Sequence, residues 1–219
     1  MEPDWIQSII HLTSMVFLVT SFALIVSPQL FSCIRFYALH SFLLAVITLS
    51  TAFQNHVYHL IISAVLTLVL KTIVIPQIFF RMIRQLGMRK EVETYINLPL
   101  SLLCSTLLVF ISFYVVGNMR ALEPFLSQEF VSIAVSTLFL GMFMMATRKK
   151  AITQVLGLLL IENGLFLMGV TTTFGMPLLV EIGIFFDVLV GAIIMGVFVF
   201  KIRGAFEGID MDKLTTLKG

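Results

Sequence analysis

Charge is what this sequence has least of. Only 12% of its 219 residues are charged, against about 25% in soluble domains. Hydrophobic residues make up 59% of the chain, and the mean hydropathy is +1.06. So few charges cannot cover a surface that faces water, which excludes a soluble domain and indicates a polytopic membrane protein. The net charge of +2 gives no reason to expect a nucleic acid partner.

The sequence also lacks the short motifs of common active sites. It contains no CxxC, no HExxH, no Walker loop and no GxGxxG, and no pair of histidines is placed to hold haem. Its two cysteines, Cys33 and Cys104, are interpreted as small apolar residues and not as a disulfide. We therefore expect the chain to hold no catalytic residue, no metal and no cofactor of its own.

Long apolar runs account for most of what is present. A run of about 18 residues or more predicts a spanning helix, because about 20 residues cross the hydrocarbon core of a bilayer. The sequence predicts an all-α fold of about seven transmembrane helices. The acidic start MEPDW has no basic segment before the first run, so no cleavable signal peptide is expected. The seven runs lie near residues 5–26, 36–53, 57–80, 98–116, 129–147, 151–173 and 177–200.

Basic residues are confined to one side of the predicted helices. Arg35, the loop 81–93, the run 148–150 and the pair Lys201 and Arg203 each follow an odd-numbered run. The other side is acidic or neutral, apart from one arginine among acids in 117–129. Cytoplasmic loops carry an excess of lysine and arginine. The N-terminus is therefore predicted outside and the C-terminus inside.

Three ionisable residues lie deep inside the predicted helices. At a rise of roughly 1.5 Å per residue, Lys71, Glu162 and Asp187 lie roughly 15, 18 and 21 Å from the inner basic edge. A charge at this depth costs about 2.5–3.5 kcal/mol and faces the bundle interior or a water-filled cavity. Two carboxyl groups at matching depth on consecutive helices predict a proton relay. The alternative is neutral carboxylic acids that hold helices together.

Small residues share a helix face with Asp187 but not with Glu162. Gly183 and Gly191 lie four residues either side of Asp187 and share its face. Gly157 and Gly164 line a different face from Glu162 on the sixth predicted helix. Small residues let membrane helices approach closely, so we expect helix packing at all four glycines.

Lys71 lies close to a predicted helix break at Pro76. Proline has no N–H, so the carbonyl of Thr72 should lose its helical partner. Charged groups beside broken helices are common in transporters. Lys71 is therefore a candidate relay residue without a permanent partner, and the alternative is a lysine that pairs with a carboxylate of another subunit.

Three further polar residues are possible accessories to the relay. His40 is only five residues from Arg35, so we expect it near the inner surface. Asn163, next to Glu162, can hydrogen-bond across helices. Glu181 is four residues from Pro177 and is expected near the outer surface.

The residues together resemble the hydrogenase-4 component E family, a membrane subunit of formate hydrogenlyase-type group 4 hydrogenase complexes. The resemblance runs the length of the chain and is strongest in the segments 162-ENG-164, 180-VEIGIFFD-187 and 213-KLTTLKG-219. Weaker agreement lies in 36-FYALHSFLL-44 and 70-LKTIVIP-76. The last three predicted helices are similar to subunit K of complex I and to its relative in multisubunit cation/proton antiporters.

The resemblance to subunit K involves the two acids. In that protein each of the last two helices has one acid, on a proton route, and Asp187 matches the second. The first would fall at Leu159, whereas this chain has Glu162 one helical turn later. A shift of three residues keeps roughly the same face and moves the carboxyl group about 4.5 Å along the axis.

The resemblance implies that the chain is one subunit of a larger complex. The chain would be a non-catalytic subunit of a redox-driven, proton-pumping oxidoreductase complex in the bacterial cytoplasmic (inner) membrane. Its partners would be antiporter-like membrane subunits and peripheral hydrogenase-like subunits, which hold the nickel–iron and iron–sulfur centres. Three other functions stay open: a structural spacer for the antiporter-like subunits, a subunit of a cation/proton antiporter, and a self-contained carrier.

The predicted organisation has three parts. Residues 1–97 form a three-helix segment with a basic cytoplasmic loop, residues 98–128 form the fourth helix and an outer loop, and residues 129–219 form the segment similar to subunit K. The first three helices are a candidate diverged copy of the last three. His40 in the segment FYALHSFLL occupies the position that Glu162 occupies in LLLIENGLFL.

Overall fold

The computed structural model describes residues 4–54, 57–85, 92–119 and 128–173, together with Gly183 and Gly191. Apart from these two glycines, the seventh predicted run lies outside the described residues. Asp187 and Glu181, and the basic pair Lys201 and Arg203, therefore lie outside them as well.

The described part of the chain is all-α, with six helices long and apolar enough to cross a membrane. The third of these spans contains a short π-helix, η1, between α3 and α4. The first six predicted runs are thereby confirmed. The elements are α1 (Asp4–Val26), α2 (Leu30–Gln54), α3 (Tyr58–Thr67), η1 (Leu68–Val74), α4 (Ile75–Gln85), α5 (Leu98–Gly117), α6 (Gln128–Thr147) and α7 (Ala151–Thr173).

The second helix differs from the sequence prediction at its start. It begins at Leu30, six residues before the predicted residue 36, so Arg35 lies inside the helix with its side chain exposed. A long arginine side chain can lie along an apolar surface while its head group stays in water. An arginine in the first turns therefore does not end a spanning helix, although it interrupts the apolar run.

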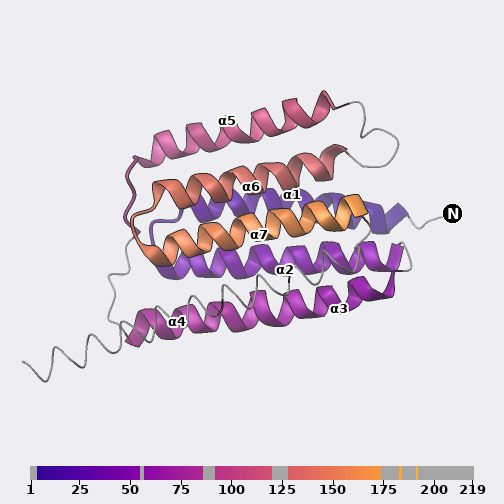
Figure 1. Ribbon diagram of the computed structural model, residues 1–219, viewed down its shortest axis with the longest axis horizontal. Helices are drawn as coiled ribbons and strands as arrows, with labels where there is room; N and C mark the ends of the chain where they lie inside the picture. Colours follow the sequence, from indigo (N-terminus) through magenta and orange to yellow (C-terminus); the bar gives the residue numbers. More distant parts are fainter. Residues whose placement is uncertain are drawn as a thin grey trace, which may run out of the picture.

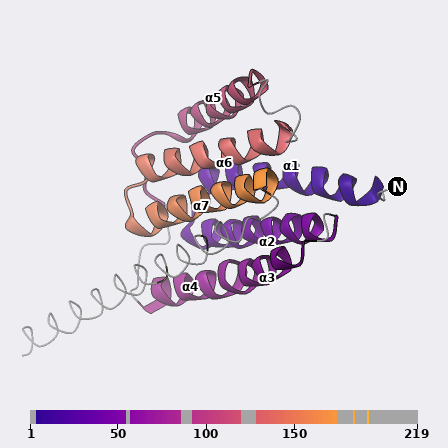
Figure 2. The same cartoon turned by 45° about the vertical axis from the view of Figure 1, so that its right-hand side comes forward.

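The helices lie side by side as one bundle (Figures 1 and 2). Helix α5 lies at one edge and contacts α6, which in turn packs along α7. Helix α1 lies behind α6 and α7 in Figure 1, and α2 lies between α7 and the span α3–η1–α4. The span α3–η1–α4 lies at the other edge against α2. Helix α2 therefore contacts α1, α7 and the π-helix at once.

The backbones of α6 and α7 approach each other closely at their glycines. A Cβ atom added at Gly141 would lie 2.7 Å from the Ile161 amide nitrogen and 2.8 Å from the Gly157 carbonyl oxygen. A Cβ at Gly157 would lie 2.9 Å from the amide nitrogen of Met145. One at Gly164 would lie 3.0 Å from the Ala134 carbonyl oxygen. Glycine is thus required along this contact, where van der Waals packing holds membrane helices together.

The two glycines expected to flank Asp187 differ from those of α7. A Cβ at Gly183 would approach the Phe166 ring to 3.4 Å, which is a tight contact with a side chain. At Gly191 a Cβ would meet no heavy atom of the described residues within 4 Å.

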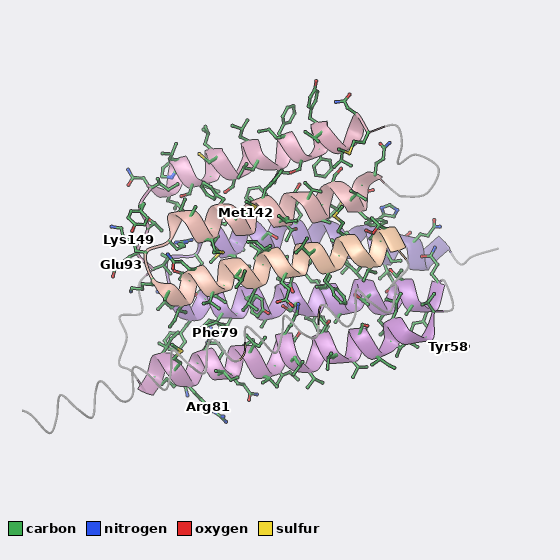
Figure 3. All side chains as sticks on the ribbon, viewed as in Figure 1. Tyr58, Phe79, Arg81, Glu93, Met142 and Lys149 are labelled. Atoms are coloured by element: carbon green, nitrogen blue, oxygen red, sulfur yellow. The ribbon has the colours of Figure 1, made fainter. Side chains whose placement is uncertain are left out.

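Several charged residues outside the membrane core lie toward one end of the bundle. Figure 3 shows Arg81, Glu93 and Lys149 toward that end and Tyr58 at the opposite one. Lys150 forms an ion pair with Glu93 at 3.4 Å, and Lys149 lies 5.0 Å from the centre of the Tyr95 ring. This grouping agrees with the predicted sidedness of the loops, while the direction in which the bundle crosses the membrane stays a prediction.

Arg148 belongs to the interior and not to the basic surface. Its guanidinium is buried and donates a hydrogen bond to the carbonyl of Ile25 near the end of α1. A cation is favourable beside the partial negative charge of a helix C-terminus. Burial lowers the pKa of the Arg148 guanidinium from its ordinary value, yet arginine stays charged in proteins. One member of the basic run 148–150 therefore ties α1 to the α6–α7 turn.

Candidate functional site

Two of the predicted relay residues meet inside the bundle. Lys71 in the π-helix and Glu162 in α7 form an ion pair, with Lys71 Nζ 2.8 Å from Glu162 Oε1. Their side chains are only 2% and 9% exposed. A buried ion pair needs good geometry and further hydrogen bonds, because each ion loses its hydration. The surroundings supply a further hydrogen bond to the lysine of the pair.

Asn163 and Ser41 extend the pair to the second helix. The Lys71 ammonium donates a hydrogen bond to Asn163 Oδ1 at 3.2 Å, and Asn163 Nδ2 donates to Ser41 Oγ at 3.1 Å. The Phe166 ring lies below the ammonium, with its centre 5.7 Å from Nζ. Glu162, Asn163 and Phe166 share one face of α7, since residues three and four apart are neighbours on a helix. Three elements thus converge on one lysine.

The π-helix at Lys71 follows from the proline. The N–H of Ile75 donates to the carbonyl of Leu70, five residues back, in place of the Lys71 carbonyl that an α-helix would use. The next residue, Pro76, has no N–H to continue this pattern, and the wide stretch ends at Val74. The helix break predicted at Pro76 therefore takes the form of a π-helix with Lys71 in the middle. Single π-turns inside α-helices are frequent at functional sites.

Lys71 has a partner that the sequence did not predict. The relay hypothesis expected no permanent partner, and the alternative expected a carboxylate of another subunit. In the structure the partner is Glu162 of the same chain. The two residues are far apart in sequence, so their meeting depends on how α7 and η1 both pack around α2, which no local pattern encodes.

His40 lies deeper than its distance from Arg35 suggested. Because α2 begins at Leu30, His40 lies ten residues into a helix of 25 residues, or about 15 Å along its axis. Its side chain is fully buried. The prediction of a position near the inner surface was wrong, since it took Arg35 as the edge of the helix. His40 immediately precedes Ser41, the partner of Asn163.

Helix α1 holds the His40 ring. Nδ1 lies 3.1 Å from the carbonyl oxygen of Phe17 and 2.9 Å from Thr20 Oγ1. The Phe17 ring stacks on the imidazole with centroids 3.7 Å apart. The hydroxyl of Thr20 donates to the same Phe17 carbonyl at 2.7 Å. Sequence reasoning missed Ser41, Thr20 and the Phe17 carbonyl. The one signal for Ser41 was its place in the segment 36–44.

Other ionisable groups lie away from this site. His11 and Glu129 pair at 3.0 Å between α1 and α6, with side chains 46% and 33% exposed. The described residues contain no group of three or more histidines, cysteines or acids placed to hold a metal ion. Within the same residues Cys33 and Cys104 are both free thiols.

The fold and the site define a multi-pass α-helical membrane protein built around a buried lysine–glutamate pair. The chain is 30% identical over 186 residues to the uncharacterized protein Rv0085 of Mycobacterium tuberculosis, covering 84% of each chain. It is 26% identical over 211 residues to hydrogenase-4 component E of Escherichia coli K12, covering 95% of this chain and 96% of the relative. The same figures hold for hydrogenase-4 component E of Shigella flexneri.

The chain belongs to the hydrogenase-4 component E family, as the sequence motifs indicated. Neither a family model nor a solved structure matches it. The membership rests on likeness along nearly the whole chain and not on one short motif.

Proposed function

We propose that this chain is a membrane subunit of a hydrogenase-type redox complex, in which Lys71 and Glu162 carry protons through the bilayer. The observation that supports the proposal is the ion pair of 2.8 Å, with both side chains almost fully buried. The relatives named hydrogenase-4 component E suggest the kind of complex. Partner subunits of that complex would hold the redox centres and perform the hydrogen chemistry.

The pair can work as a proton station because its two charges depend on each other. With Glu162 ionised and Lys71 protonated, the pair is neutral as a whole. A proton that arrives on Glu162 removes this balance and leaves the ammonium as an uncompensated buried charge, which is strongly unfavourable. The ammonium then tends to release its own proton onward. Protonation at one end thereby drives deprotonation at the other.

Asp187 is the second carboxyl group of the proposed route. It lies outside the described residues, and its role rests on its predicted depth and on the resemblance to subunit K. Glu181 is proposed to lie near the outer end of the same route.

The experiment measures proton translocation by membrane vesicles that contain the whole complex, together with its redox turnover. Glu162→Gln keeps the shape of the side chain and cannot ionise. We expect the complex to assemble and translocation to fail. Lys71→Arg keeps the charge but does not readily release a proton, so it should fail in the same way. His11→Asn, an exposed position on α1, is the control that should translocate normally.

Two results would contradict the relay. Normal translocation by Glu162→Gln and Lys71→Arg would favour a spacer that only anchors antiporter-like subunits. Cation transport by the purified chain without any partner would favour a self-contained carrier. Mass spectrometry of the proteins that co-purify with the chain distinguishes a hydrogenase-type complex from a cation/proton antiporter.

A further inference from the structure

The His40 ring has a defined tautomer. Nδ1 lies in hydrogen-bonding range of the Phe17 carbonyl, which has no hydrogen to give, so Nδ1 must carry the hydrogen. The hydroxyl of Thr20 is already donating to this carbonyl, and its lone pairs are free to accept from Nδ1. With the hydrogen on Nδ1, both contacts are hydrogen bonds. The other nitrogen, Nε2, then carries a lone pair and no hydrogen.

This lone pair is buried without a hydrogen-bond donor among the described residues. Buried polar atoms are almost always hydrogen-bonded, and an exception in a native fold calls for an explanation. The stacked Phe17 ring and the two contacts at Nδ1 fix the ring, so Nε2 cannot turn toward another donor without breaking them. The fold thus holds one imidazole nitrogen with a free lone pair in place, with no hydrogen bond given to it by the part of the chain described.

Among the described residues, the relay lysine is a charged group that acts on His40. Lys71, from η1, lies within electrostatic range of the imidazole. The residues that contact the ring from α1, Phe17 and Thr20, are uncharged. On α2 itself the next residue is Ser41, which joins Asn163 and, through it, Lys71. His40 and the polar chain that surrounds the lysine are thus attached to the same turn of α2.

We propose that His40 is a third proton-carrying residue, which receives at Nε2 the proton that Lys71 releases. This inference rests on the proposed relay. When Glu162 takes up a proton, an N–H bond of the Lys71 ammonium breaks and an N–H bond forms at Nε2. The amine becomes neutral and the imidazole becomes an imidazolium. Nδ1 keeps its hydrogen and its contact with Phe17 throughout, so the ring need not move, and the reverse step restores the starting state.

Two substitutions separate proton transfer from packing. His40→Asn places an amide near the position of Nδ1, where it can still donate to the Phe17 carbonyl, but it has no group at Nε2 and cannot titrate. His40→Gln places its amide nearer the position of Nε2 and also cannot titrate. A proton carrier predicts that both variants assemble with normal partners and lose proton translocation to the level of Glu162→Gln. A packing role predicts that His40→Asn translocates normally.

The matched control is His11→Asn, since His11 lies on the exposed side of α1 and away from the pair. Normal translocation by His40→Asn, while Glu162→Gln fails, would overturn the role of His40 and leave the proposed relay intact. Normal translocation by all these variants would overturn the relay itself.

A spectroscopic measurement tests the tautomer independently of pumping. Nitrogen-15 spectra of the complex, labelled at histidine, are compared with those of His40→Asn to isolate the signal of His40. We expect the form with hydrogen on Nδ1 and an unprotonated Nε2 in the resting complex. A signal from the opposite tautomer would overturn the proposal, because Nε2 could not then accept a proton.

Discussion

Helix α7 has two faces that contact their neighbours in different ways. Toward α6 it has Gly157 and Gly164, and the backbones approach so closely that a single methyl group would collide. Toward α2 and η1 it presents Glu162 and Asn163, which reach their partners through side chains. One face is a fixed contact between backbones and the other is a contact between protonatable side chains. A membrane helix can thus hold a stable position while groups on its other side change charge.

The largest effect is expected when only one member of the buried ion pair on the polar face is removed. Lys71→Met should strand the Glu162 carboxylate and cost about 3–5 kcal/mol, because an unpaired buried charge remains. The double variant Lys71→Met with Glu162→Gln removes both charges and should be close to the wild type in stability. Thermal denaturation of the purified complex measures both. A double variant as unstable as the single one would show that the polar face acts mainly through packing.

A smaller effect is expected on the glycine face. Gly141→Ala must push α6 and α7 apart, since its methyl group would lie within 3 Å of two backbone atoms. Overpacking of this kind costs about 1–3 kcal/mol. The control is Gly117→Ala at the end of α5, where an added Cβ meets nothing among the described residues within 4 Å. Equal melting temperatures for the two variants would disprove the close contact.

A single hydrogen bond on the polar face should matter less. Ser41→Ala removes the acceptor of Asn163 Nδ2, and hydrogen bonds between membrane helices contribute about 0.6 kcal/mol on average. Without this acceptor the Asn163 side chain can rotate away from the site. Proton translocation should therefore slow in Ser41→Ala, while the complex still assembles. Ser112→Ala is the control, because among the described residues that hydroxyl bonds to its own helix, at the carbonyl of Leu108. An unchanged translocation rate in Ser41→Ala would remove Ser41 from the site.

The smallest effect is expected at the exposed pair of His11 and Glu129. Glu129→Gln should change stability by only about 0.3 kcal/mol, since ion pairs that water can reach contribute little. The comparison with Lys71 and Glu162 isolates the effect of burial on the same kind of contact. If Glu129→Gln lowered stability as much as Lys71→Met does, the pair of His11 and Glu129 would have to be buried by a partner subunit in the complex.

The sequence predicted much of this fold because an apolar run of spanning length strongly indicates a membrane helix. It also identified Lys71 and Glu162, since a charge in such a run is costly and must face protein or water. One error came from treating a charge as a helix end: Arg35 lies inside α2, so His40 was placed too near the surface. Arg148 does follow the fifth span, as predicted, but its side chain is buried. Asp187 stays a prediction because it lies outside the described residues.

The sequence by itself determined the all-α class, six of the spanning helices, and which residues in the described ranges are too polar for lipid. Each of these depends on the composition and period of one local segment. The tertiary structure alone decided that Glu162 is the partner of Lys71, that Asn163 and Ser41 join them, and that α1 fixes the tautomer of His40. Such contacts depend on the relative height and rotation of separate helices, which are set by the packing of the whole bundle.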